Sequence, residues 1–153
     1  MPLSVEELQV EETLEQMPDD LILMKFDRIV PNRAYTVFVL GNEEKQFAIY
    51  TEPQIGRMIQ MQLAGLSRTR PMTHDLLLLI LKGLDVSLLR VVITDMQDTV
   101  YFAKLCLEQK QKDLHCLVEI DARPSDCITL AVMMNVPIYC TRELFERVIP
   151  FYD

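Results

Sequence analysis

The apolar and polar positions along the chain follow two patterns, which predict strands and helices in a repeated order. Six segments have the β-branched, aromatic or alternating composition of β-strands, and they form two groups of three: 21–30, 34–40 and 46–50, then 88–95, 99–108 and 114–121. After each group, apolar residues recur at helical spacing, in a helix that begins at Pro53 in the first case and at Pro124 in the second. Two consecutive β-β-β-α units are therefore expected.

The two units also align with each other in sequence. In "AIYTEPQIGRMIQM" and in "EIDARPSDCITLAV" a predicted strand ends just before a proline that begins a helix. Ile49 then corresponds to Ile120, and Pro53 corresponds to Pro124. This registry indicates an internal duplication. The predicted fold class is α+β, with mostly antiparallel strands and helices packed on them.

A further helix is expected between the two units. Thr73 is a suitable N-cap, and the helix continues to Gly83 through the block "LLLLIL", Leu76 to Leu81. A helix that is apolar on all sides is typically buried, so we expect this one to lie inside the protein. The block is too short to cross a bilayer, which takes about 20 residues, and no membrane contact is predicted. A short strand over 137–140 and a helix capped by Thr141 complete the expected elements.

The negative charge is concentrated at the N-terminus. The chain of 153 residues has a formal net charge of −8; residues 1–20 contain seven acids and no Lys or Arg, and the remainder has 16 acids and 15 bases. We therefore divide the chain into an acidic N-terminal arm, 1–20, helical or flexible, and a single domain, 21–153. Ser4 and Glu7 form a capping box for a helix in the arm. The arm is either a solvated tail or an acidic lid or partner contact.

The four cysteines are scattered among apolar residues, and none belongs to a C-x-x-C pair. We expect reduced thiols in the core, although Cys106 and Cys116 could face each other across a hairpin. The N-terminus shows no basic region followed by an apolar stretch, so no secretion signal is expected. These two observations together predict a cytoplasmic location.

The first polar cluster lies at the start of the leucine-rich helix. In "RPMTHDLL", Thr73 and Asp75 are ordinary helix-start residues, which leaves Arg70 and His74 as candidates for chemistry. A histidine titrates near neutral pH and can act as a base or a metal ligand. The alternative is that His74 is a surface residue of the first helical turn.

A second cluster, "ITDMQDT", places Asp95 at the end of one predicted strand, as Asp121 is placed at the end of another. If these strands are neighbours with aligned ends, the two carboxylates could share a divalent cation. The sequence therefore predicts a metal site at this edge of the sheet, conditional on the order of the strands.

The third cluster, "DARPSD", lies where a predicted strand is followed by a helix. Pro124, Ser125 and Asp126 are explained by the needs of a helix start, where a missing N–H is harmless and acceptors and negative charge are favoured. Asp121 and Arg123 are not explained in this way. The equivalent residues of the first unit are tyrosine and glutamate, so the second unit has a charge pattern that the first lacks.

Several motifs of known chemistry are absent from the sequence. It contains no G-x-x-x-x-G-K-[ST] phosphate loop, G-x-S-x-G elbow, G-x-G-x-x-G fingerprint or H-E-x-x-H pair. Basic residues do not form a strip interleaved with aromatics, which strong nucleic-acid binders commonly show.

The segments "RPMTHDLL", "VVITDMQDTVYFAKL" and "EIDARPSDCITLAV", in this order and spacing, resemble the bifunctional nuclease (BFN) domain family. The resemblance covers roughly 21–147 and implies an α+β fold of duplicated β-β-β-α units, frequent self-association, and cleavage of both DNA and RNA. The chain departs from the family pattern in the first unit, where "YTEPQIGRMI" is not alanine-rich, and at Cys127 and Thr129. The positions that match the family motifs are Arg70, Pro71, Thr73, His74, Asp75, Thr94, Asp95, Asp121, Arg123, Pro124, Ser125 and Asp126.

The first functional hypothesis is a nuclease, that is, a phosphodiesterase acting on DNA and RNA. This chemistry needs an activated water and positive charge beside the phosphate oxygens. The candidates divide by role: His74 or Asp75 as the base, Arg123 or Arg70 as the phosphate clamp, Ser125 as a further catalytic candidate, and Asp95, Asp121 and Asp126 as ligands of Mg²⁺ or Mn²⁺. Nucleic acid and a second copy of the chain are the expected partners.

Two alternatives remain open from the residues alone. The second hypothesis is a non-catalytic, oligomeric interaction module, in which the Arg and Asp residues brace helix starts or a subunit interface. The nearly neutral domain and the absence of a basic groove favour it, because binding a polyanion normally draws on several Lys or Arg contacts. The third is a small-anion sensor that uses the helix N-terminus at Pro124.

Overall fold

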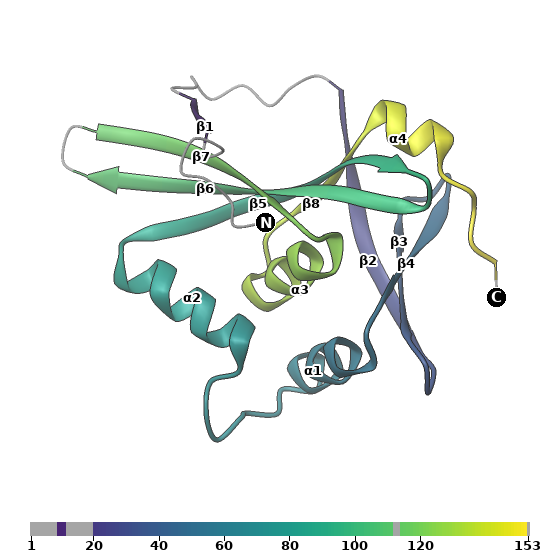
Figure 1. Ribbon diagram of the computed structural model, residues 1–153, viewed down its shortest axis with the longest axis horizontal. Coiled ribbons are helices and arrows are strands. Elements are labelled where there is room, and N and C mark those ends of the chain that lie inside the picture. Colours follow the sequence, from purple (N-terminus) through teal and green to yellow (C-terminus); the bar gives the residue numbers. More distant parts are fainter. Residues whose placement is uncertain (1–8, 12–19, 112–113, 153) are drawn as a thin grey trace.

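The computed structural model describes residues 9–11, 20–111 and 114–152, and it contains the two expected units. The first consists of β2 (Leu21–Pro31), β3 (Thr36–Gly41), β4 (Gln46–Thr51) and α1 (Pro53–Leu63); the second consists of β5 (Val86–Gln97), β6 (Val100–Gln111), β7 (Leu114–Ala122) and α3 (Pro124–Met134) (Figure 1). Helix α2 (Thr73–Gly83) connects the units, and β8 (Ile138–Thr141) and α4 (Arg142–Arg147) follow them. A short strand, β1 (Gln9–Glu11), precedes them.

The strands of the described residues form one mixed sheet in the order β1-β7-β6-β5-β8-β2-β3-β4. All neighbours are antiparallel except β5 and β8, which are parallel. The last strand in the sequence, β8, therefore lies between the two three-stranded units, and each unit runs outward from it. The predicted α+β fold with duplicated β-β-β-α units is confirmed.

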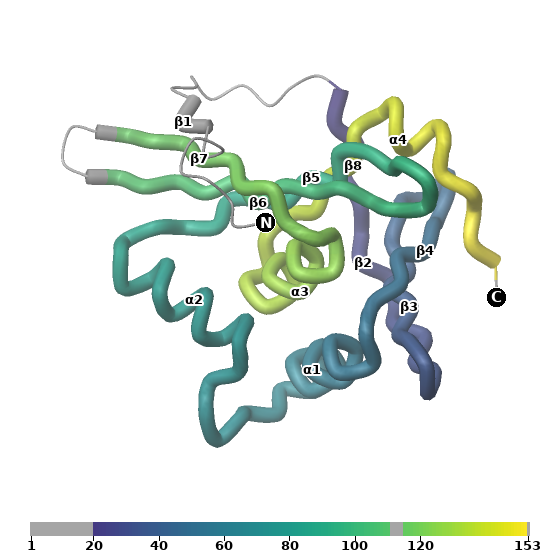
Figure 2. Tube along the Cα trace, viewed as in Figure 1, coloured from purple at the N-terminus to yellow at the C-terminus, as the bar shows by residue number. Residues whose placement is uncertain are grey.

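The two halves of the sheet turn steeply relative to each other. Figures 1 and 2 show β2, β3 and β4 crossing the direction of β5, β6 and β7, with α1, α2 and α3 gathered on one side. Phe47 of β4 stacks on Tyr101 of β6 at a ring-centroid distance of 6.0 Å, although these strands are not neighbours in the sheet. This curvature brings together the starts of α1 and α3, which contact each other.

A single core lies between the sheet and the helices. Cross-strand partners share a face of a sheet, so Ala103, Leu105 and Leu107 of β6 point toward the helices, with their partners on β5 and β7. Leu130 and Ala131 of α3 cover them, and all five residues are buried. The opposite face of these strands carries charged residues.

Helix α1 approaches β3 closely because residue 56 is a glycine. A Cβ atom added there would lie 2.2 Å from the Oγ1 atom of Thr36, which is itself buried. Only glycine fits at this distance without displacing its neighbour. The same approach brings the N-terminus of α1 toward that of α3.

The prediction that the leucine-rich helix is buried was wrong. His74 is the only buried residue of α2, while Leu76, Leu79 and Ile80 are about half exposed, at 51%, 52% and 48%. Six consecutive apolar residues cover every side of a helix, but the sheet and α3 contact only one side of α2. The N-cap also differs: it is Met72, and Thr73 is the first helical residue.

The N-terminal arm was expected to be helical or flexible. Gln9–Glu11 form instead a β-strand that pairs antiparallel with β7. The outer edge of β7 offers unpaired backbone groups, and strand pairing satisfies them. The rest of the arm, including Ser4 and Glu7, lies outside the described residues.

The remaining expectations concern the cysteines and the membrane. All four cysteines are free, and Cys106 and Cys116 pair in the register with Glu119 and Gln109 rather than with each other. Within the described part of the chain, no helix has both the length and the apolar character needed to span a membrane.

Candidate functional site

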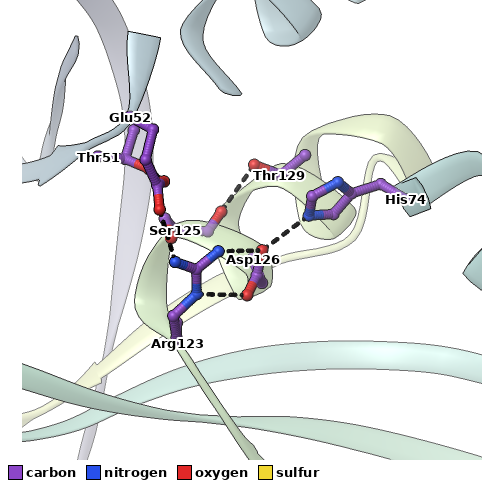
Figure 3. Close-up of polar contacts among 7 residues, drawn as sticks. All are labelled: Thr51, Glu52, His74, Arg123, Ser125, Asp126 and Thr129. Carbon is purple, nitrogen blue, oxygen red and sulfur yellow. Dashed lines mark hydrogen bonds and ion pairs between the residues drawn. The ribbon is translucent and has the colours of Figure 1, made fainter. Parts of the chain in front are cut away.

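A chain of polar contacts joins the starts of three helices. His74, near the start of α2, is only 8% exposed, and its Nε2 atom lies 2.8 Å from Oδ1 of Asp126 in the first turn of α3. Figure 3 shows the imidazole and the carboxylate facing each other between the two helices (Figure 3). The structure thus brings together two candidate residues that are 52 positions apart in the sequence.

Arg123, the N-cap of α3, extends this chain to α1. Its Nε and Nη2 atoms donate to the two carboxylate oxygens of Asp126, at 2.9 and 3.3 Å. Its Nη1 atom donates to Oε1 of Glu52 at 2.7 Å. Glu52 is the N-cap of α1, so the N-cap residues of the two equivalent helices form an ion pair with each other.

Glu52 was not among the functional residues predicted from the sequence. The signal was present, because Glu52 and Arg123 occupy equivalent positions of the two units with opposite charge. What could not be foreseen was that the duplicated units place their helix starts face to face. We call His74, Asp126, Arg123 and Glu52 the polar cluster.

Both carboxylates of the polar cluster are ionised at neutral pH. The hydrogen bond from His74, together with Arg123, lowers the pKa of Asp126 to about 2 in spite of partial burial. The hydrogen bonds from Arg123 and Thr51 lower the pKa of Glu52 to about 2. An ionised Asp126 accepts hydrogen bonds only, so Nε2 of His74 carries a proton, and in the neutral imidazole the lone pair is then on Nδ1.

The polar cluster lies at one edge of an apolar groove of about 630 Å³ between α1, α2 and the sheet. The groove is lined by His74, Arg123 and Asp126 at its polar edge and by Leu105 and Ile120 of the sheet. Among the described residues, Nδ1 of His74 has no hydrogen-bond partner. The histidine therefore has a fixed orientation and an unoccupied nitrogen, as a general base requires.

Asp75 and Arg70, the other candidates on this side, lie outside the polar cluster. Asp75 forms a two-pronged ion pair with Arg68, which donates from Nε to Oδ2 at 2.6 Å and from Nη2 to Oδ1. It also accepts from the backbone N–H of Met72 at 2.9 Å. Arg68 holds the pKa of the Asp75 carboxyl below its usual range, so Asp75 serves as a structural anion. Arg70 is exposed and lines a separate cavity of about 930 Å³.

A cation shared by Asp95 and Asp121 would require their two strands to be neighbours in the sheet, and they are not. Strand β6 lies between β5 and β7, which separates the two strands by about 10 Å. Asp95 accepts a hydrogen bond from Nη2 of Arg147 at 2.5 Å. Asp121 is exposed and pairs in the register with Lys104, on the face of the sheet opposite to Ile120 and the groove.

The carboxylates of the described residues therefore do not fit a single metal centre. No group of three or more His, Cys, Asp or Glu side chains in that part of the chain is arranged to hold an ion. Asp126 already accepts from His74 and Arg123, and Asp95 and Asp121 lie on other strands. The described residues thus offer the predicted Mg²⁺ or Mn²⁺ no preformed set of protein ligands.

Ser125 is buried next to the polar cluster, at 6% exposure. Its carbonyl oxygen accepts a hydrogen bond from the Thr129 hydroxyl at 2.6 Å. Its own hydroxyl has no partner among the described residues. The residue lines a third cavity, of about 520 Å³, beside the starts of α1 and α3. Of the predicted site residues, the structure thus brings together His74, Arg123 and Asp126, with Ser125 adjacent.

Comparison with known proteins identifies the family of the chain. Residues 38–150 match the model of the bifunctional nuclease domain. Two proteins of Mycobacterium tuberculosis, the uncharacterized protein MT1877 of strain CDC 1551 / Oshkosh and the uncharacterized protein Rv1829 of strain ATCC 25618 / H37Rv, are each 30% identical over 99 residues. That alignment covers 65% of this chain and 56% of each relative, so the chain spans about half the length of the curated relatives that it matches. The family match covers most of the chain, and the protein therefore belongs to the bifunctional nuclease domain family.

Proposed function

We propose that this protein is a nuclease that hydrolyses phosphodiester bonds of DNA and RNA at the polar cluster. The observation that carries the proposal is the contact of 2.8 Å between the buried His74 imidazole and the ionised Asp126 carboxylate at the edge of a groove. The family to which the chain belongs supports the substrate class by its name.

The roles follow from the geometry of the polar cluster. Asp126 holds the proton of His74 on Nε2, so that Nδ1 can accept a proton from a water molecule as that water attacks phosphorus. The P–O bond to one ester oxygen of the nucleic acid then breaks, and that leaving oxygen takes a proton from solvent water. Without the carboxylate, the imidazole would lose both its orientation and the anion that stabilises its protonated form. Such a base contributes about 10²- to 10⁴-fold to a hydrolysis rate.

Arg123 is the residue placed to bind a substrate phosphate. Its side chain is 59% exposed although it contacts both Glu52 and Asp126. A guanidinium has five N–H donors in a planar fork, and Arg123 uses three of its nitrogen atoms on carboxylates. A phosphate oxygen would compete with the exposed Glu52 carboxylate for Nη1 of Arg123. Glu52 therefore has to move before the phosphate can bind to that nitrogen.

We further propose that the reaction depends on Mg²⁺ or Mn²⁺, as expected from the sequence. The described residues offer no preformed site, but Mg²⁺ commonly keeps several waters and binds through one or two carboxylates together with substrate phosphates. We therefore propose that the cation binds to the protein only together with the substrate phosphate.

The experiment that tests the nuclease proposal compares the two histidines of the chain. Cleavage of single-stranded DNA and RNA oligonucleotides by purified wild-type protein is measured with Mg²⁺, with Mn²⁺ and with EDTA, beside the variants His74→Gln and His115→Gln. We expect His74→Gln to lower the rate at least about 100-fold. His115 pairs with Glu108 at the far end of β6 and β7, so His115→Gln should cleave like the wild type.

Two results would refute the proposal. One is a folded wild-type protein that cleaves neither substrate under any of these conditions. The other is cleavage that is the same in wild-type and His74→Gln protein, which would locate the activity elsewhere or in a contaminant.

A second proposal concerns the partner of α2. We infer that a second copy of the chain covers this helix, because Leu76, Leu79, Ile80 and Leu84 form an exposed apolar stripe at three- and four-residue spacing. Two copies of α2 packed antiparallel would place the basic Lys82 end of one helix beside the acidic first turn of the other. The two helix dipoles would then be antiparallel, which is a favourable arrangement. A two-fold interface of this kind presents the same surface from each copy.

The observation about α2 also favours the alternative function. If the nuclease test fails and self-association holds, the protein is a non-catalytic oligomeric module, in which the polar cluster braces the starts of α1, α2 and α3. In that case His74→Gln and Asp126→Asn would lower stability without changing any cleavage.

A further inference from the structure

The cavity beside the starts of α1 and α3 has features that the polar cluster does not use. It has a volume of about 520 Å³ and lies between the end of β4, the turn from β5 to β6 and the two helix starts. Arg123 lines both this cavity and the groove beside His74. A molecule in the cavity would therefore reach the same guanidinium as a phosphate in the groove.

Hydrogen-bond donors in this cavity lack acceptors. Neither α1 nor α3 has a side chain that caps its first N–H groups, whereas Thr141 caps α4. Ser125, which is 6% exposed, lines the cavity, and its hydroxyl has no partner among the described residues. A ligand that carries acceptors would satisfy both the helix start and this hydroxyl in place of solvent.

The charges of the cavity indicate what kind of acceptor fits. In the part of the chain that the structure describes, Arg123 is the only cation that lines the cavity. Glu52 and Asp126 both form ion pairs with Arg123. These two carboxylates are ionised, so the local charge is negative before any ligand enters. A phosphate group in the cavity would have to displace Glu52 from Arg123, whereas a neutral group with carbonyl oxygens would not.

An aromatic surface borders the same cavity. Tyr50 lines it and is 60% exposed. Tyr35 packs edge-on against the Tyr50 ring at a centroid distance of 5.4 Å and an interplanar angle of 68°, which holds that ring in place. Tyr101 lines the cavity further in, where burial raises the pKa of its hydroxyl. Exposed aromatic rings are the surfaces on which proteins stack unpaired bases.

We propose that this cavity binds one unpaired nucleobase, stacked on Tyr50, with its carbonyl edge toward the Ser125 hydroxyl and the start of α3. The proposal rests on the proposed function in taking nucleic acid as the substrate. It adds that the substrate is single-stranded, because a base in a duplex is already paired and stacked. The phosphate next to the bound base would then lie at Arg123, between the cavity and His74.

The test measures binding rather than cleavage. A fluorescein-labelled tetrathymidine is titrated with wild-type protein in EDTA, and the affinity is compared with that for a tetranucleotide of the same length and charge that has abasic sites in place of bases. We expect the bases to increase affinity about tenfold or more, in line with stacking of one base. A duplex of the same strand should compete poorly.

Three variants locate the effect. Tyr50→Ala should remove most of the preference for bases over abasic sites, Tyr50→Phe should keep it, and Ser125→Ala should reduce it several-fold. Tyr152→Ala changes a tyrosine that is 83% exposed and lines a different cavity, so it should behave like the wild type. Circular dichroism establishes that each variant is folded.

Equal affinity for the two tetranucleotides would overturn the proposal, as would a preference for bases that survives Tyr50→Ala. The result is independent of catalysis. A base preference without any cleavage would leave the cavity proposal standing and refute the nuclease. Cleavage that depends on His74 without a base preference would refute the cavity proposal alone.

Discussion

At the scale of single residues, Asp126 is the centre of the polar cluster. Its place in the sequence is that of a helix-start carboxylate, and in the structure it also accepts hydrogen bonds from His74 and from Arg123. A solvated first-turn aspartate needs neither partner. His74 is 52 positions from Asp126 and reaches it only on folding, whereas Arg123 is three positions away. These hydrogen bonds to the Asp126 carboxylate make stability depend on pH.

The first prediction follows from the pKa values of the two carboxylates. Folding lowers the pKa of Asp126 from 3.8 to about 2 and that of Glu52 from 4.5 to about 2. A lowered pKa stabilises the folded state above the unfolded-state value, and this contribution is lost as pH falls through the folded-state value. The free energy of unfolding in urea should therefore decrease between about pH 5 and pH 2.

The control for this prediction is Asp126→Asn. This variant should be less stable than the wild type at pH 5, and its stability should fall less steeply toward pH 2, because one of the two shifted carboxylates is gone. Parallel profiles for the two proteins would show that Asp126 is not coupled to His74 and Arg123 in solution.

A second residue-scale prediction concerns the turn between β5 and β6. Thr99 has a φ of 70° and Asp98 a φ of 48°, and a β-branched residue is strained in this left-handed region. Thr99→Gly should raise the free energy of unfolding by about 0.5–1 kcal/mol, measured by urea denaturation. Asp98→Gly should give a smaller gain, because aspartate tolerates this conformation better. A loss of stability in Thr99→Gly would show that the Thr99 side chain makes a contact worth more than the strain.

At the scale of elements, proline and glycine determine how α1 and α3 are placed. Both helices begin with a proline after an extended N-cap residue, as predicted from the alignment of the two units. Gly56 then lets α1 contact β3, because no side chain separates the helix from Thr36. The position of Glu52 relative to Arg123 depends on this packing.

The third prediction uses two glycines at helical positions. Gly56→Ala should destabilise the protein by about 1–3 kcal/mol, since the new methyl group collides with the buried Thr36 side chain. Gly83→Ala, at the end of α2, meets no atom within 4 Å and should be neutral or stabilising by about 0.5–1 kcal/mol. Thermal or urea denaturation of both variants measures the difference. Equal stability of the two would mean that α1 does not pack as closely as described.

The elements themselves could be predicted from the sequence because their signals are local. The prolines at 53 and 124 mark helix starts, and strand composition marks the six strands of the two units. The environment of α2 could not be predicted. An apolar block indicates that the helix is covered, but it does not distinguish between the core of the same chain and another protein chain. The pairing of Gln9–Glu11 with the edge of β7 could not be predicted either, because the sequence of the arm contains no local signal for a strand.

At the scale of the whole molecule, the site depends on where strands lie in the sheet. The sequence placed Asp95 and Asp121 at strand ends, but the insertion of β6 between their strands separates them. Glu52 and Arg123, 71 positions apart, meet because the two units face each other across β8. Motif residues can be recognised along a chain, whereas their convergence is a property of the topology.

The fourth prediction concerns self-association through α2. The double variant Leu76→Lys/Ile80→Lys places two charges in the exposed apolar stripe and should be monomeric where the wild type is oligomeric, as measured by size exclusion with light scattering over a range of concentrations. Ile149→Lys changes an aliphatic residue that is 80% exposed elsewhere and should leave the assembly unchanged. A monomeric wild type, or an assembly that persists in the double variant, would exclude this interface.

The central claim is that His74 and Asp126 act as one catalytic unit, and a double-mutant cycle on cleavage tests it most directly. The value of kcat/KM for a single-stranded oligonucleotide is measured for wild type, His74→Gln, Asp126→Asn and the double variant. Residues that act together are not additive, so the double variant should lose no more activity than the worse of the two single variants. Losses that multiply in the double variant, or four proteins that cleave alike, would contradict the claim.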